Sequence, residues 1–565
     1  MAGIKVNRLK SGTISVSLAE SYYDKEKKYA SQKRKYLGVL DEKNNELLQA
    51  KGIAELNDKE KALLDERGIK YCGRRAERAG RKRKIFGLVR NGEIATPENI
   101  TNVTEPCCVE ALQQLSDQMG LTKSLEQAFG VKVAQELLLL SIHQVCEGNA
   151  LYLAEHWLEN TTGQLTGWSD STLGRRLSEL GNNISGIDEF FRAWIKSRGM
   201  PRGLIHDTTS ISTYSQNLEL AEWGYNRDKE DLPQLNLALA VERNSQLPLW
   251  YRTISGSIPD VVTLKGTSEL LLELGLKDFS YSLDRGYYSA SNVADALEAG
   301  IDFDMGLPIS GVQAKKLLKT HLSELNSVAG AFADDKDILR HAEGIFCAIM
   351  KDESERKLKV HIYKNNKRAA EQERRLISAV LELENKAKRT HFARAKHARE
   401  WIDDNARGMA KFLKPIKIGT EFMVIRDNEA IDRKIETLGV FMLLCSNPAI
   451  DKETALSNSR ARDMAEKIFD SYKNANGNHR LHTGDDDNAA GRIFLGFLSV
   501  ILRSLLENKM RDAELLKKYS VPEALALLRK IKQVTFSSGT KWRSDIPKKA
   551  REIATALDYN PALSK

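Results

Sequence analysis

Short apolar runs separated by turn residues give residues 201–310 the most regular hydrophobic pattern in the chain. Runs bounded by Gly, Pro, Asn, Asp or Ser predict strands, and apolar residues repeating every three or four positions predict helices. The predicted strands are 204–211, 235–241, 247–254, 279–283 and 303–308, and the predicted helices are 262–274 and 292–299. The order β-β-β-α-β-α-β matches a ribonuclease-H-like core, in which the first and fourth strands lie side by side.

The rest of the chain divides around this core, so we expect a multidomain α/β protein. Alternating apolar residues predict strands near the N-terminus, and helical periodicity dominates residues 105–200 and the C-terminal end. The interval before residue 451 is too long for a structureless loop and predicts an α+β insertion. The predicted limits are 1–70 (β-rich), 71–104 (basic arm), 105–200 (helical, DNA-binding or scaffold), 201–310 (first part of the core), 311–450 (insertion), 451–510 (second part of the core) and 511–565 (helical).

The longest apolar run, 493–506, is too short to cross a bilayer and contains Arg503, so it predicts a buried helix. The six cysteines form no CxxC pair, which favours reduced thiols in an intracellular, cytoplasmic protein. No phosphate-binding glycine loop is present, so ATP use is not implied.

The net charge of +9 is modest for 565 residues, so local clusters of charge are more informative than the total. Seven basic residues fall within eleven positions of the arm. A solvated linker would explain them, but we favour an arm that contacts phosphates without reading sequence. These residues are Arg74, Arg75, Arg78, Arg81, Lys82, Arg83 and Lys84.

Two aspartates, Asp207 and Asp284, come at or near the ends of the first and fourth predicted strands. Either one alone is most simply a turn residue, but the predicted strand order makes them neighbours. Far downstream, Glu466 shares one predicted helix face with Arg462 and Lys473. Mg²⁺ prefers oxygen ligands, and a pair of such ions serves phosphodiester chemistry. We therefore predict that Asp207, Asp284 and Glu466 are catalytic metal ligands.

Several alternatives stay open at this point. A solvated charged stripe would also explain the helical residues. Glu436 is a rival third carboxylate, although it lacks the aligned Arg and Lys. His206, beside Asp207, should point to the opposite strand face and lie in the core or behind the site. The remaining histidines form no ligand pattern in the sequence.

Several segments resemble bacterial insertion-sequence transposases of the DDE class, in the group with a Tyr-Arg-Glu-Lys signature and a β-rich insertion domain. The resemblance rests on HDTTSIS around Asp207, LDRGYYS around Asp284 and RDMAEKIFDSYK around Glu466. The segment LPQLNLALAVERNSQLPLWYRTISGSIPD and the N-terminal KRKYLG also resemble that group. One position departs from it, because Ser459 stands where the signature has tyrosine.

The resemblance implies cut-and-paste transposition with two Mg²⁺ ions, which Mn²⁺ can replace. Water would nick the element end, the freed 3′-hydroxyl would form a hairpin, and the reopened end would join target DNA. It also implies a homodimer that pairs two terminal repeats. From the helix face that they share with Glu466, we expect Arg462 and Lys473 to contact the DNA backbone. Arg285 is a further DNA-binding candidate. The alternatives are a metal-dependent endonuclease without strand transfer and a non-catalytic DNA-binding protein on a retired transposase fold.

Overall fold

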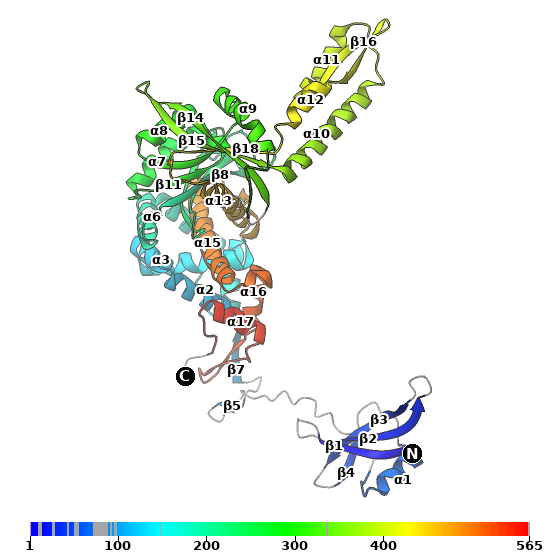
Figure 1. Ribbon diagram of the computed structural model, residues 1–565. Coiled ribbons are helices and arrows are strands. Elements are labelled where there is room, and N and C mark those ends of the chain that lie inside the picture. Colours follow the sequence, from blue (N-terminus) through cyan, green and yellow to red (C-terminus); the bar gives the residue numbers. More distant parts are fainter. Residues whose placement is uncertain are drawn as a thin grey trace. The chain divides into compact units, whose positions relative to one another are not determined.

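The computed structural model describes residues 2–8, 14–24, 29–41, 45–49, 56–71, 89–90, 93–94, 99–148, 150–334 and 337–562. The chain forms two compact units, 1–101 with 534–544 and 102–533 with 545–565. Figure 1 shows the helices and strands of both units. The seven basic residues of the predicted arm lie outside the described residues.

The first unit contains an antiparallel four-stranded sheet in the order β1-β2-β3-β4. Its strands are β1 (Ala2–Arg8), β2 (Ile14–Asp24), β3 (Tyr29–Asp41) and β4 (Glu46–Gln49). Helix α1 (Asp58–Asp65) begins with a capping box made by Asn57 and Glu60. Its Leu64 joins Val16 and Leu37 in a small core. The strands expected near the N-terminus are therefore present, and β2 and β3 pair as an antiparallel hairpin.

The second unit is built on one mixed sheet in the order β10-β9-β8-β11-β12-β18-β15-β14-β13, with short β19 (Arg480–Leu481) also pairing β8. The first five strands are β8 (Gly203–Thr213), β9 (Gln234–Glu242), β10 (Pro248–Ser255), β11 (Ser280–Leu283) and β12 (Asp302–Leu307). Strands β8, β9 and β10 pair antiparallel, whereas β8, β11 and β12 run parallel. The first and fourth predicted strands are thus neighbours, as expected.

Burial on both faces explains why β8 and β9 read as nearly continuous apolar or small-residue runs. Every residue of β8 is buried except Asp207. Helices α7 (Leu264–Glu273) and α8 (Ala290–Glu298) follow the pattern expected from the sequence, and Ser289 caps α8 by accepting from Asn292 N–H. Single turns η3 (Asp260–Val262) and η4 (Arg285–Tyr287) precede them.

Helices that precede the strands of the main sheet in the sequence pack around the long α15 (Asp486–Asp512). They are α2 (Cys107–Gln118), α3 (Leu121–Glu147), α5 (Asp170–Asn182) and α6 (Ile184–Ser197), and α4 (Ala154–Thr162) packs against α3. A Cβ on Gly181 would lie 1.8 Å from the Asp487 carbonyl oxygen, and one on Gly491 would lie 2.0 Å from that of Leu177. These glycines therefore let α5 and α15 approach closely.

The buried helix predicted from the apolar run 493–506 is present as α15, which extends beyond that run at both ends. By length and composition α15 is able to cross a membrane, with a mean hydropathy of 1.7 over its most apolar window. That window is 83% buried inside the protein, where Phe494 packs edge-on against Phe190. Burial against helices therefore explains its apolar composition.

The interval 311–450 contains two structural parts. Strands β13 (Ala331–Ala333), β14 (Ile338–Ile349), β15 (Glu355–Asn365) and β18 (Val440–Cys445) extend the main sheet, with α9 (Val312–Asn326) against β14. The other part has its own apolar cluster, including Val380, Ile402 and Val424. It comprises α10 (Asn366–Ala387), α11 (Ala395–Ala406), β16 (Leu413–Ile418), β17 (Glu421–Arg426) and α12 (Asn428–Ile435).

The segment carrying Glu466 is not the single regular helix that the stripe of charges assumed. Helix α13 (Lys452–Ala461) ends before Arg462, α14 (Asp463–Asp470) begins after it, and a π-helical turn follows at Ser471–Ala475. The wider π turn changes the rotation per residue. Lys473 is therefore out of the predicted phase with Glu466.

Short elements complete the fold. These are β5 (Val89–Arg90), β6 (Glu93–Ile94), β7 (Ile100–Thr104), α16 (Val521–Leu528), β20 (Gln533–Phe536), β21 (Lys541–Arg543) and α17 (Lys548–Ala556).

Candidate active site

Asp207 and Asp284 meet at adjacent positions of two parallel strands. The register pairs Ser280 with Gly203, and Ser282 with Ile205. Continued by two residues, the same register sets Asp284 beside Asp207. Asp207 interrupts the buried face of β8, and Asp284 follows the last residue of β11. The sheet therefore brings together two acids that are far apart in the sequence.

Burial governs the protonation of Asp207. Loss of hydration raises its pKa to about 6, and the nearby charge of Asp284 adds to the rise. The Thr208 N–H donates to Asp207 Oδ1 at 2.8 Å, and Arg227 and Arg462 lie close enough to oppose the shift. A buried acid beside a second acid is an environment that a bound cation would stabilise.

Asp284 is held from two directions. Its Oδ1 accepts from the Arg285 N–H at 2.6 Å and from Arg462 Nη1 at 2.9 Å. Its side chain is 45% exposed, so one side of the carboxylate stays accessible. Arg462 thus joins the strand-end acid to the junction between α13 and α14.

A third aspartate, Asp260, stands beside this pair and was not predicted from the sequence. Burial raises its pKa, opposed by an ion pair with Arg227, and the charge of Asp284 raises it further. Asn292 Nδ2 donates to the carbonyls of Val261 (2.6 Å) and Tyr287 (2.7 Å), which ties η3 to η4. The Pro-Asp pair in the segment SGSIPD was its only sequence signal.

Glu466 lies in the first turn of α14, next to the strand that bears Asp207. Ala465, Ile468 and Phe469 bury the opposite side of this helix, and α14 lies against β8. Arg462 has helical backbone angles, so Glu466 follows it by one turn. Glu466 is exposed and makes no hydrogen bond or ion pair with any described residue. It remains the candidate third carboxylate.

Lys473 does not have the exposed position expected of a phosphate contact. It is buried, and its Nζ lies 2.5 Å from Asp228 Oδ2, in the loop between β8 and β9. Arg227 and Glu230 of the same loop pair with Asp260 and Arg480. Three ion pairs therefore hold this loop beside Asp207, and the pair between Lys473 and Asp228 is one of them.

The other candidates occupy different settings. Arg285 is exposed at the rim of the site, next to Asp284. His206 is fully buried, bonds the Leu239 carbonyl through Nδ1 at 3.1 Å, and has a pKa lowered by burial to about 4, as expected of a core residue. Glu436 directly follows α12, where its carbonyl accepts from Lys364 Nζ.

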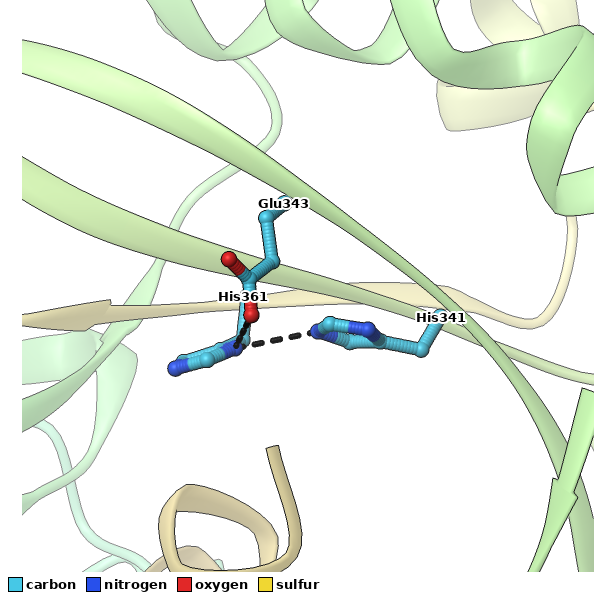
Figure 2. A group of neighbouring side chains, drawn as sticks. All are labelled: His341, Glu343 and His361. Atoms are coloured by element: carbon cyan, nitrogen blue, oxygen red, sulfur yellow. Dashed lines mark hydrogen bonds and ion pairs between the residues drawn. The ribbon is translucent and has the colours of Figure 1, made fainter. Parts of the chain in front are cut away.

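One cluster of metal-ligating side chains lies outside this site and escaped the sequence pattern. His341 and Glu343 on β14 converge with His361 on β15 (Figure 2). Strand pairing, not sequence spacing, brings the two histidines together. A histidine and a glutamate two positions apart on one strand face were the only local signal.

The aspartate pair fits divalent cations such as Mg²⁺, since all its donors are carboxylate oxygens. Each aspartate uses Oδ1 for backbone N–H groups, and no described residue hydrogen-bonds to Asp207 Oδ2. Asp207 and Asp284 form a pair of carboxylates that such ions would fit, and Glu466 is the candidate for a third. The site as described is therefore a carboxylate centre on the interior strand β8 and at the end of its neighbour β11, flanked by Arg227 and Arg462.

Comparison with known protein families identifies the family to which the chain belongs. The sequence pattern described as "Transposase DDE domain" matches residues 198–502, which is more than half of the chain. The chain belongs to this family, and it is a DNA transposase. The match includes the strands of Asp207 and Asp284 and the helix of Glu466.

Similarity beyond the family pattern is weak. No curated protein matches the chain. Among solved structures, the cryo-EM structure of a piggyBac transposase synaptic complex with hairpin DNA has a TM-score of 0.35 and 10% identity. The similarity covers 75% of this chain and 76% of that one.

Proposed function

We propose that this transposase nicks DNA at the ends of its element and transfers the freed strand into target DNA, using a ribonuclease-H-like core. The observation that carries the proposal is the register of β8 and β11, which sets Asp284 beside Asp207. The antiparallel β8–β9–β10 and parallel β8–β11–β12 arrangement supports the assignment of the core.

Asp207, Asp284 and Glu466 would hold two Mg²⁺ ions, with Mn²⁺ as a substitute. When bound, such ions activate an attacking water or 3′-hydroxyl and stabilise the leaving oxygen. The protein's part is to keep the acids close together and accessible. Burial on β8 fixes Asp207, the Arg285 N–H orients Asp284, and the buried side of α14 presents Glu466 outward.

Positive residues at the rim would align the DNA backbone. Arg285 is exposed there, and Arg462 is able to exchange its bond to Asp284 for a phosphate once cations occupy the carboxylates. The basic arm at residues 74–84 would add contacts that read no sequence, so binding should weaken as salt rises. We further propose a cytoplasmic bacterial insertion-sequence enzyme that pairs two terminal repeats as a homodimer.

The test uses duplexes carrying the DNA that flanks the protein's own coding sequence, incubated with the full chain and Mg²⁺. We expect nicks at the element ends and products joined to target DNA, and chelation should abolish both. Nicks without joined products would indicate an endonuclease. Binding without any cleavage would indicate a retired transposase fold. Hairpin products test whether Ser459 can replace the signature tyrosine.

A further inference from the structure

Strand pairing brings three ligand-bearing side chains to one place on the outer strands of the main sheet. Glu343 on β14 stands directly opposite His361 on β15. His341 lies two residues before Glu343 and so occupies the same face of β14. Figure 2 shows the three side chains converging. The cluster belongs to the sheet extension, not to the strands that bear Asp207 and Asp284.

The separations between the ligand atoms suit one small cation. His341 Nε2 lies 3.0 Å from His361 Nδ1, which lies 3.7 Å from Glu343 Oε1. All three atoms lie within 4.8 Å of one another. Tetrahedral zinc with bonds of about 2.0–2.1 Å places its ligands roughly 3.3 Å apart, between the two observed separations. Small side-chain adjustments would therefore complete the geometry.

A second contact orients the central ring. His361 Nε2 lies 3.2 Å from the Ile450 carbonyl oxygen, which can only accept a hydrogen bond. This contact keeps the proton on Nε2 and directs the Nδ1 lone pair toward the cluster, as outer contacts of metal-binding histidines commonly do.

Charges around the cluster are mixed. Lys359 and Lys452 lie near enough to lower the pKa of His341, and they oppose an added cation. Glu343 and Asp304 act on His361 in the opposite sense, and Asp451 also interacts with it. Lys359 is engaged with the Ile450 carbonyl at 3.1 Å. Asp304 is paired with Arg243, so the negative charge nearest a bound ion is that of Glu343 itself, and Asp451 adds to it.

We infer that His341, Glu343 and His361 form a binding site for one zinc-like divalent ion, separate from the catalytic carboxylates, with water as the fourth ligand. The mixed imidazole and carboxylate donors favour zinc over magnesium.

A structural role follows from what surrounds the site. Ile450 lies two residues before the start of α13, and Tyr363 Oη donates to the Lys452 carbonyl at 2.7 Å. The bound ion would therefore hold β14 and β15 against the start of α13, the helix that leads to Arg462 and Glu466.

The test is a titration of chelator-treated full-length protein with Co²⁺, followed by Zn²⁺. The site should produce the strong visible absorption of tetrahedral Co²⁺ at one molar equivalent, and Zn²⁺ should abolish it. Glu343→Gln alters a side chain that is 53% exposed and should weaken binding roughly tenfold or more. Glu355→Gln, exposed on the same hairpin, is the matched control and should bind as the unmodified protein does.

The variant Asp284→Asn tests whether this site is separate from the catalytic centre. If it is, the variant should keep the Co²⁺ absorption. Zn²⁺ should also raise the melting temperature of the unmodified protein and of Glu355→Gln more than that of Glu343→Gln. Absence of the absorption, or binding insensitive to Glu343→Gln, would show that His341 and His361 form only a hydrogen-bonded pair. Loss of the absorption in Asp284→Asn would overturn the assignment to a separate site.

Discussion

Arg462 Nη1 lies 2.9 Å from Asp284 Oδ1, so a residue at the α13–α14 junction supplies the counter-charge of a strand-end acid. The contact joins two segments that the sequence separates by the whole insertion. It also places a positive group where a bound cation would add its own charge. Arg462 and divalent ions should therefore compete for Asp284.

Arg462→Gln should tighten the binding of Mn²⁺ in the absence of DNA while weakening the binding of end DNA. The substitution removes a partly exposed positive charge beside the Asp284 carboxylate. The dissociation constants for Mn²⁺ and for end DNA should therefore each change by roughly three- to tenfold. Calorimetric Mn²⁺ titration measures the first effect, and a filter-binding assay measures the second. Arg433→Gln, exposed on α12, removes the same charge elsewhere and should change neither. Weaker Mn²⁺ binding in Arg462→Gln would contradict the competition.

The choice of third carboxylate can be tested by comparing two exposed glutamates. Glu466→Gln should reduce strand cleavage by at least about 100-fold, because an amide is a poor ligand for divalent metal ions. Glu436→Gln, at the end of α12, should cleave at the normal rate. Gel analysis of end-labelled DNA under single-turnover conditions measures both. Equal activity of Glu466→Gln and the unmodified protein would remove Glu466 from the site.

The sequence predicted the aspartate pair because β8 and β11 carry strong local signals. Both strands are short runs of apolar or small residues, and their acids interrupt or directly follow the runs. Asp260 gave no comparable signal, since it belongs to a single turn after β10 and reaches the site only through tertiary packing. His341 and His361 escaped for the same reason, because an antiparallel pairing brings them together.

The protonation of Asp207 predicts how stability varies with pH in the metal-free protein. Its folded pKa of about 6 exceeds the value of about 3.9 for an unfolded aspartate, so the folded state binds the proton more tightly. Stability should then fall as pH rises from about 4 to 6, by roughly 2–3 kcal/mol in all. The Asp207→Asn variant has no carboxyl group to ionise at this position, so its stability should not fall in this way. It should be more stable than the unmodified protein at pH 7.5.

Thermal melting of both proteins without divalent ions, at pH 4.5 and pH 7.5, checks this. The advantage of Asp207→Asn should be large at the higher pH and small at the lower. Mg²⁺ should then stabilise the unmodified protein more than the variant. Parallel melting temperatures at both pH values would show that burial does not hold Asp207 in an unfavourable ionised state.

Lys473 should act through the loop between β8 and β9 and not through DNA phosphates. Lys473→Gln and Asp228→Asn each break the same ion pair, so both should destabilise the protein, by roughly 1–3 kcal/mol. Neither should change the slope of DNA affinity against salt concentration. If Lys473→Gln alone lowered that slope by about one, Lys473 would contact a phosphate after all.

The prediction for Lys473 depended on a regular helix, and the structure shows why that assumption failed. A spacing rule of 100° per residue holds only while the helix stays α-helical. The π turn after Asp470 changes the phase between Glu466 and Lys473, and nothing in the residue pattern of RDMAEKIFDSYK announces this irregularity. Burial of Lys473 is a consequence of tertiary packing that periodicity alone does not encode.

The most direct measurement is Mg²⁺-dependent nicking of element-end DNA by the unmodified protein and by Asp207→Asn, with DNA binding measured on the same samples. If Asp207 and its neighbour Asp284 hold the ions, the variant should bind the duplex with near-normal affinity and produce no nick. Undiminished nicking by Asp207→Asn would show that the chemistry takes place somewhere else.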